Sequence, residues 1–210
     1  MNLLHKGFLL RNIKRKGRDS GQLHWLTGLF FFLILMVLMN AQLQLAAWNS
    51  TSQRLEDALA ASNLASALIN IPKFGKKHRV EMIEAEEAYQ IYREAVKENL
   101  CLNEEWETSG QELICGPVEI VDYVIYNVDK ERVEAIRVGK NGRITETVEG
   151  RRGEMKAPDQ SIIECPGIYS EIRFPVRGFL GITVTAHKGK LVDIVSDIEP
   201  DEEEGEDIHS

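Results

Sequence analysis

From Trp25 to Met39 the sequence reads WLTGLFFFLILMVLM, a run that contains no charged residue. A helix needs about 20 apolar residues to cross the hydrocarbon core of a bilayer, and the following NAQLQLAAW extends the run to Trp48. Trp25 and Trp48 would stand roughly 34 Å apart along a helix, and tryptophan favours the two membrane–water interfaces. We therefore predict a single membrane-spanning helix over residues 24–48, which includes Phe31 and Leu35.

The charges before this run predict its orientation. The chain has six Lys or Arg residues and one acidic residue before Trp25. Because basic flanks stay in the cytoplasm, we expect residues 1–23 to form a cytoplasmic lead and the chain after Trp48 to lie outside the cytoplasmic membrane, at the cell surface. Nucleic-acid binding by the lead is disfavoured, since the short arm lacks interleaved aromatic residues for base stacking. A cleaved secretory signal is disfavoured because Leu45, not a small residue, would be the third residue before a cut after Ala47.

The helix is predicted to continue beyond the membrane. No Gly or Pro occurs from Leu29 to Ile71, and Pro72 and Gly75 supply the stop, which gives an extramembrane extension over residues 49–75. This extension is rich in alanine, and small residues let neighbouring elements approach closely. Two interpretations stay open: a good helix former packed on its own domain, or an assembly face that contacts other subunits, with Ala58, Ala61, Ala65 and Leu68 as its residues.

Residues 76–198 are predicted to form an α+β exterior domain. A basic cluster over 76–79 opens a second, amphipathic helix, VEMIEAEEAYQIYREAVKENLCL. The apolar period then changes to two, and PVEIVDYVIYNVD, ERVEAIRVG and GRITETVEG predict three strands, with Asn141–Gly142 as a hairpin turn. Two or more further strands follow, with a turn at Lys188-Gly189-Lys190. Helices followed by an antiparallel sheet are an α+β arrangement.

No motif for catalysis or metal binding occurs in the chain. The patterns HExxH, GxSxG and GxxxxGK are absent, and the acidic residues fall on predicted strands or helix surfaces. We therefore expect no enzymatic activity and no cofactor. Residues 199–210 contain seven acidic residues, and such a run repels itself and stays disordered. The run lacks the spacing of a calcium-binding loop.

Cysteine usage leaves two possibilities. The chain has three cysteines, Cys101, Cys115 and Cys165, and an exterior domain permits a disulfide bond with one thiol left over. Cys101 and Cys115 would close a short loop rich in Glu and are the preferred pair. The alternative is three unpaired thiols.

Two segments, KRKGRDSGQLHWLTGLFFFLILMVLM (residues 14–39) and QRLEDALAASNLASALI (residues 53–69), give the chain its resemblance to a known family. A basic lead, a Gly before an apolar span, an unbroken Ala-rich helix and a β-rich domain resemble the TadE-like pseudopilins of tight-adherence (Tad) pili, which are type IV pilin-like. The resemblance implies processing after Gly17 or Gly21. Such families usually carry Glu at the fifth position after the processed Gly, whereas this chain has Gln22 and Leu26 there.

The resemblance also implies a function. The chain would be a non-enzymatic minor component of a pilus or secretion apparatus, assembled with other pilin-like subunits by a cytoplasmic ATPase. Two other classes remain: a single-span envelope scaffold or regulator whose exterior domain binds a protein partner, and a membrane-anchored sensor that binds a small ligand between helix and sheet. The sensor class is weaker because the basic lead contains no signalling domain.

Overall fold

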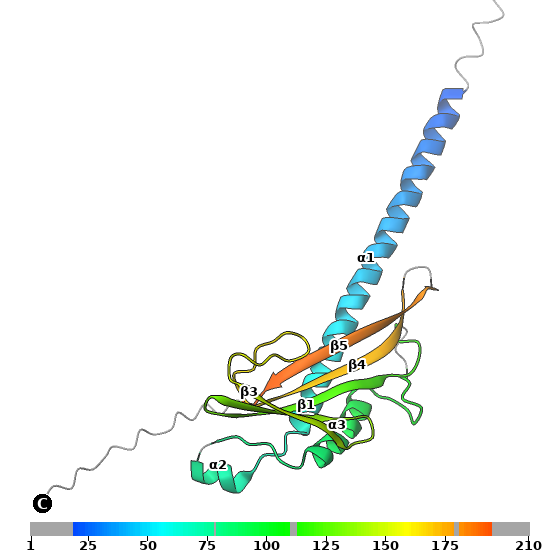
Figure 1. The fold of residues 1–210 in the computed structure, drawn as a ribbon. Coiled ribbons are helices and arrows are strands. Elements are labelled where there is room, and N and C mark those ends of the chain that lie inside the picture. The colour runs from blue at the N-terminus through cyan, green and yellow to red at the C-terminus, as the bar shows by residue number, and fades with distance from the viewer. Residues whose placement is uncertain (1–18, 78, 110–112, 179–180, 195–210) are drawn as a thin grey trace, which may run out of the picture. The chain divides into compact units, whose positions relative to one another are not determined.

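The computed structural model describes residues 19–77, 79–109, 113–178 and 181–194. The chain divides after Trp48 into two compact units. The predicted α+β class is confirmed, with a long apolar N-terminal helix and an antiparallel sheet of five strands (Figure 1). In chain order the elements are α1 (Asp19–Ala65), α2 (Ile71–Lys77), α3 (Ala85–Asn99), β1 (Glu119–Asp129), β2 (Arg132–Val138), β3 (Ile144–Arg151), β4 (Gly167–Arg177) and β5 (Thr183–Asp193).

Helix α1 ends at Ala65, short of the predicted stop at Pro72. After α1 the chain pairs with a later segment: the Asn70 N–H donates to the Glu81 carbonyl at 2.9 Å, and the Ile83 N–H donates to the Leu68 carbonyl at 2.9 Å. This short antiparallel pairing satisfies backbone groups that a longer helix would have used internally. The prediction assumed that only a helix-breaking residue ends a helix, and it is wrong here.

Pro72 and Gly75 lie inside the short helix α2 instead of ending α1. The Asn70 side-chain oxygen accepts a hydrogen bond from the Lys73 N–H at 3.1 Å, which caps the first turn of α2. Pro72 is tolerated in that turn because the first N–H groups of a helix have no partner within the helix.

Helix α3 begins five residues later than predicted. Met82, expected on the helix, is extended: its N–H donates to the Asn127 side-chain oxygen at 2.7 Å, and the Asn127 amide donates to its carbonyl at 3.0 Å. Glu84 then takes a left-handed conformation with φ 55°. The residues of α3 that face the core are Ala85, Ala88, Tyr89, Tyr92 and Val96.

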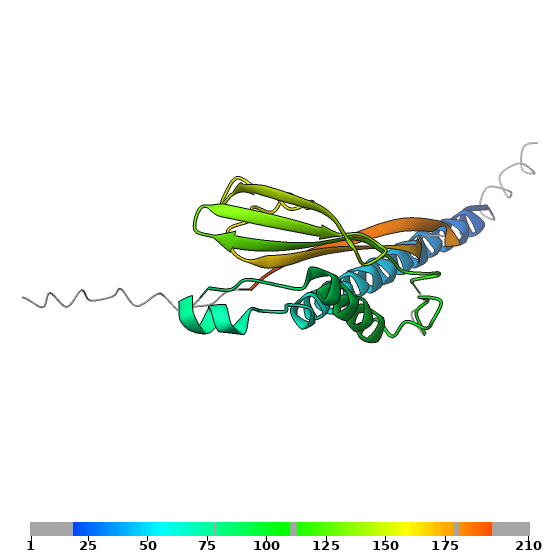
Figure 2. The same ribbon diagram turned by 60° about the horizontal axis from the view of Figure 1, so that its bottom comes forward.

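The sheet has the strand order β3-β2-β1-β4-β5, with every neighbouring pair antiparallel. Ile168, Ser170 and Ile172 of β4 point to one face of the sheet, where residues 49–65 of α1 and helix α3 pack (Figure 2). Tyr169 points to the other face, where the β3–β4 connection covers part of the sheet with Ala157 and Ile163. The larger of the two cores therefore lies between the helices and the sheet.

The hairpin turn at Asn141–Gly142 is confirmed, and the turn at Lys188–Lys190 is wrong. The Gly139 N–H donates to the Arg143 carbonyl at 2.9 Å, and Gly142 has φ 74°. Strand β5, in contrast, continues through Gly189, which pairs with Glu171 of β4. The tyrosine ring of Tyr169 lies where a Gly189 side chain would project, so this glycine provides room for an aromatic ring and does not mark a turn.

We expect Gly189→Ala to lower the free energy of unfolding by about 1–2 kcal/mol, because the new methyl group collides with the buried Tyr169 ring. Urea unfolding of the full-length protein in detergent measures this change. Gly75→Ala is the matched control, since nothing lies within 4 Å of the added methyl group, and it should be neutral or slightly stabilising because Ala favours helix. Equal stability of wild type and Gly189→Ala would contradict the assignment.

Candidate functional site

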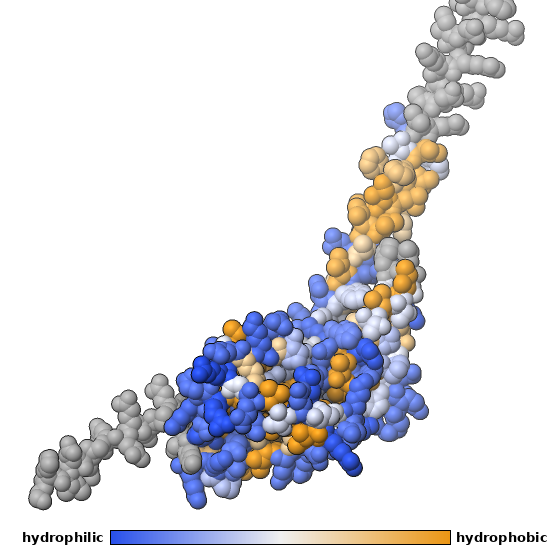
Figure 3. Space-filling view, viewed as in Figure 1, coloured by the Kyte–Doolittle hydropathy of each residue, from blue (hydrophilic) through white to orange (hydrophobic). Residues whose placement is uncertain are grey.

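The apolar residues of α1 in the first unit are exposed. The exposed fractions are 71% for Trp25, 66% for Phe31, 57% for Leu35 and 38% for Trp48. This part of the helix forms a continuous hydrophobic surface (Figure 3). By length and composition the helix is apolar enough to cross a membrane. Exposed apolar patches of this kind are unusual on soluble proteins and are typical of surfaces that contact lipid or another protein.

The outer part of α1 in the second unit is held to the sheet by polar as well as apolar contacts. Leu55 and Leu59 are buried in the larger core. Three small polar residues, Ser62 and Asn63 of the same helix and Ser66 directly after its end, are also buried. We call these three residues and their partners the polar seam. The helix was predicted over these residues but the seam was not, because its signal in the sequence is a group of polar residues within an Ala- and Leu-rich run.

The seam joins the outer α1 and Ser66 to three strands, β1, β4 and β5, and to α3. The Asn63 side-chain amide donates to the carbonyls of Ile168 at 3.2 Å and Lys190 at 3.0 Å. The Tyr123 hydroxyl of β1 donates to the Ser66 hydroxyl at 2.9 Å. From α3, the Asn99 amide donates to the Ser62 hydroxyl at 3.0 Å. Hydrogen bonds to fixed partners on separate elements hold the helix in one position along the sheet.

An ion pair lies beside the apolar contacts, since Glu56 directly follows Leu55. Lys188 of β5 pairs with Glu56, and its ammonium donates to the Ser52 hydroxyl at 3.0 Å. The hydrogen bond and charge of Lys188 lower the pKa of Glu56. Together with the seam, this pair holds one side of the outer α1 against the sheet of its own domain.

The predicted assembly face is divided by this packing. Ala58 is buried in the larger core, and Leu68 is partly buried against it. Ala61 and Ala65 are exposed, and Leu64 between them is 54% exposed. The surface left available on the outer α1 therefore centres on Ala61, Leu64 and Ala65.

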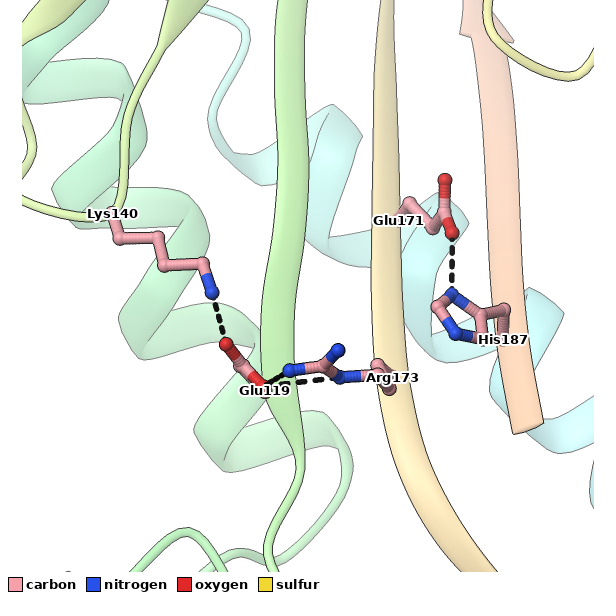
Figure 4. A network of polar contacts seen from close by, with 5 residues as sticks. All are labelled: Glu119, Lys140, Glu171, Arg173 and His187. Atoms are coloured by element: carbon pink, nitrogen blue, oxygen red, sulfur yellow. Dashed lines mark hydrogen bonds and ion pairs between the residues drawn. The ribbon is translucent and has the colours of Figure 1, made fainter. Parts of the chain in front are cut away.

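A polar network lies on the sheet face opposite the helices (Figure 4). Glu119 of β1 pairs with Lys140 and with Arg173, whose Nε lies 3.1 Å from the carboxylate. Glu171 of β4 pairs with the His187 ring at 2.8 Å and accepts a hydrogen bond from the Tyr169 hydroxyl at 3.1 Å. Each carboxylate already has two partners, which favours a brace across the strands over an acid or base for catalysis.

The hydrogen bonds from Lys140 and Arg173 lower the pKa of Glu119 from its ordinary value of about 4.5. The contribution of Glu119 to stability is therefore fully present above pH 4.5 and is lost as pH falls through the lower folded-state pKa. We expect Glu119→Gln to lower the free energy of unfolding by about 0.2–1 kcal/mol at pH 7, because the groups are exposed. This difference should shrink towards pH 3.

Urea unfolding between pH 3 and pH 7 measures this dependence. Glu131→Gln is the control, since Glu131 is exposed and has no ion-pair partner among the described residues. A difference between wild type and Glu119→Gln that stays constant across this range would show that the ion pairs do not act as the structure indicates.

A cleft of about 340 Å³ lies between α2, the chain that follows it, and strands β1 to β3. Its charged walls are largely paired: Lys73 with Glu81, Arg79 with Asp129, and Arg132 with Glu149. Glu134 also lines the cleft and has no ion-pair partner among the described residues. The cleft is large enough for a small polar ligand. Because most of its charged side chains are paired with one another, they do not favour a particular ligand.

The remaining predicted site residues are the glycines at which processing was expected and the three cysteines. Gly21 falls within α1, whereas Gly17, most of the lead and the acidic tail lie outside the described residues. The thiols of Cys101, Cys115 and Cys165 are free, so the Cys101–Cys115 disulfide stays a prediction. Within the described ranges, no group of three or more His, Cys, Asp or Glu side chains has the arrangement of a metal site.

Comparisons with protein-family models, with curated proteins and with solved structures find no match for this chain.

Proposed function

We propose that this protein is a membrane-anchored, non-enzymatic, pilin-like component of a Tad or type IV-like pilus or secretion apparatus, similar to a TadE-like minor pseudopilin. The observation that carries the proposal is the exposed apolar run of α1 between Trp25 and Trp48. A bilayer removes that surface from water at a gain of roughly 25 cal/mol per Å². The basic lead supports an amino terminus inside and a folded domain outside the cytoplasmic membrane.

The two sides of the outer α1 support a role in assembly. The side with Leu55, Leu59 and Asn63 packs on the sheet, so the helix needs no partner to be ordered. The other side presents Ala61, Leu64 and Ala65 to solvent. Small exposed residues let another helix approach closely, and other pilin-like subunits or pilus assembly proteins are the proposed partners.

The cleft beside α2 favours a second candidate function. A single-span envelope scaffold or regulator would use its exterior domain to bind a protein partner or a small ligand, and a polar cleft of about 340 Å³ provides a place for one. In that case the alanine surface of α1 would be solvated and would contact no subunit.

The first prediction concerns topology. With the three native cysteines replaced by serine, Asp201→Cys should react with a membrane-impermeant maleimide in intact cells whose wall is permeable to the reagent. Gln22→Cys, which stays on the protein whether or not the chain is cut after Gly17 or Gly21, should react only after lysis, because the basic lead is expected in the cytoplasm. Protein labelling on gels measures both reactions at matched expression. The reverse pattern would refute the proposed orientation, and extraction of the protein by alkaline carbonate would refute the membrane anchor.

The second prediction concerns assembly. A photo-crosslinker placed at Leu64 in native membranes should capture a pilin-like subunit, and Ala65→Leu should abolish that product, because an overpacked contact costs about 1–3 kcal/mol. Since Ala65 is exposed, this change should leave the unfolding midpoint of the domain unaltered. Ala58→Leu is the contrasting variant: Ala58 is buried in the domain's own core, so its substitution should lower that midpoint.

Persistence of the crosslink in Ala65→Leu, or crosslinking only to proteins unrelated to pilins, would favour the scaffold function over the pilin-like one.

A further inference from the structure

Three buried polar atoms in or beside the polar seam have no hydrogen-bond partner among the described residues: Asn63 Oδ1 on α1, the Tyr92 hydroxyl on α3 and Ser170 Oγ on β4. All three residues are at most 1% exposed. Buried polar groups in folded proteins are nearly always paired with protein or with ordered water. Three unpaired atoms contributed by three elements therefore need a common explanation.

The sheet register brings these groups together. Ser170 pairs with Tyr123 of β1 on one side and with Lys190 of β5 on the other. The Asn63 amide donates to the carbonyls of Lys190 and of Ile168, two residues before Ser170, so its carboxamide lies over the same part of the sheet. The Tyr92 ring lies 4.7 Å from the Tyr123 ring, measured between centroids.

The Tyr92 hydroxyl is near Ser170. Burial raises the pKa of Tyr92, and the neighbouring Ser170 hydroxyl opposes that rise, yet the two hydroxyls do not meet the geometry of a direct hydrogen bond. The orientation of the Asn63 side-chain amide is also determined, because its nitrogen faces two carbonyl oxygens. Exchanging the amide nitrogen and oxygen would place Oδ1 against both carbonyl oxygens. Its Oδ1 is left as an acceptor.

We infer that one internal water molecule is bound at this point, where it bridges α1, α3 and β4 through Asn63 Oδ1, the Tyr92 hydroxyl and Ser170 Oγ. Water offers two donors and two acceptors, so it can donate to Asn63 Oδ1 and Ser170 Oγ and accept from the Tyr92 hydroxyl. Three hydrogen bonds are typical of buried water. The three groups are neutral, which suits water better than an ion.

The sign of a stability change tests this inference. If water bridges the hydroxyls, Tyr92→Phe and Ser170→Ala should each raise the unfolding equilibrium constant roughly fivefold, because each removes a made hydrogen bond. The double variant should be little less stable than the less stable of the two single variants, since both changes release the same water. If the hydroxyls are unpaired, removing either one should leave stability unchanged or increase it, and that result would overturn the inference.

Urea unfolding of the full-length protein in detergent micelles gives these constants. Tyr126→Phe is the matched control, because Tyr126 is buried in the smaller core on the other sheet face, and it should change the constant less than twofold. A direct bond between Tyr92 and Ser170 would give the same stability changes without water. Nuclear Overhauser effects between water and the Ser170 amide proton separate these cases in the unaltered protein: a long-lived water produces a cross-peak, and its absence overturns the inference.

Discussion

The contact between α1 and strands β4 and β5 is the interaction on which the exterior unit depends. Leu55 and Leu59 supply apolar burial, but apolar contacts alone allow a helix to shift along a sheet. The Asn63 amide, bonded to one carbonyl on each of two strands, permits a single position. Other buried groups then follow from that position, because Ser66 meets the Tyr123 hydroxyl and Ser62 meets Asn99 of α3 only at this register.

The same contact determines what the molecule presents to partners. A helix packed on a sheet has one side buried and one side available, and α1 places Ala61, Leu64 and Ala65 on the available side. The opposite face of the sheet is occupied by the β3–β4 connection and by the charge network around Glu119 and Glu171. The available side of α1 therefore presents small or apolar side chains, whereas the opposite face of the sheet presents larger polar side chains that are paired with one another.

Much of this architecture could be predicted from local sequence patterns. The apolar run of α1, the period-two strands and the Asn141–Gly142 turn depend on residues that are close in the chain, and they were placed correctly. The end of α1 at Ala65 depends on the pairing of the chain after it with Glu81 and Ile83, and no local sequence pattern predicts that pairing. Gly189 was taken for a turn because its purpose, room for Tyr169, depends on another strand. The polar seam was missed for the same reason, since its partners come from distant elements.

The separation of the Asn63 contacts along the chain has a consequence for how this protein reaches its folded state. Asn63 lies 105 residues from Ile168 and 127 residues from Lys190. During synthesis, Leu55 and Leu59 emerge before Asn63, while Lys190 of β5 emerges 127 residues after Asn63. Contacts of such long range slow folding, because the entropy of closing a long loop must be lost before the contact forms. Until β5 has been made, the apolar surface of the outer α1 therefore lacks the complete sheet on which it packs. During this interval the protein is most exposed to aggregation and proteolysis.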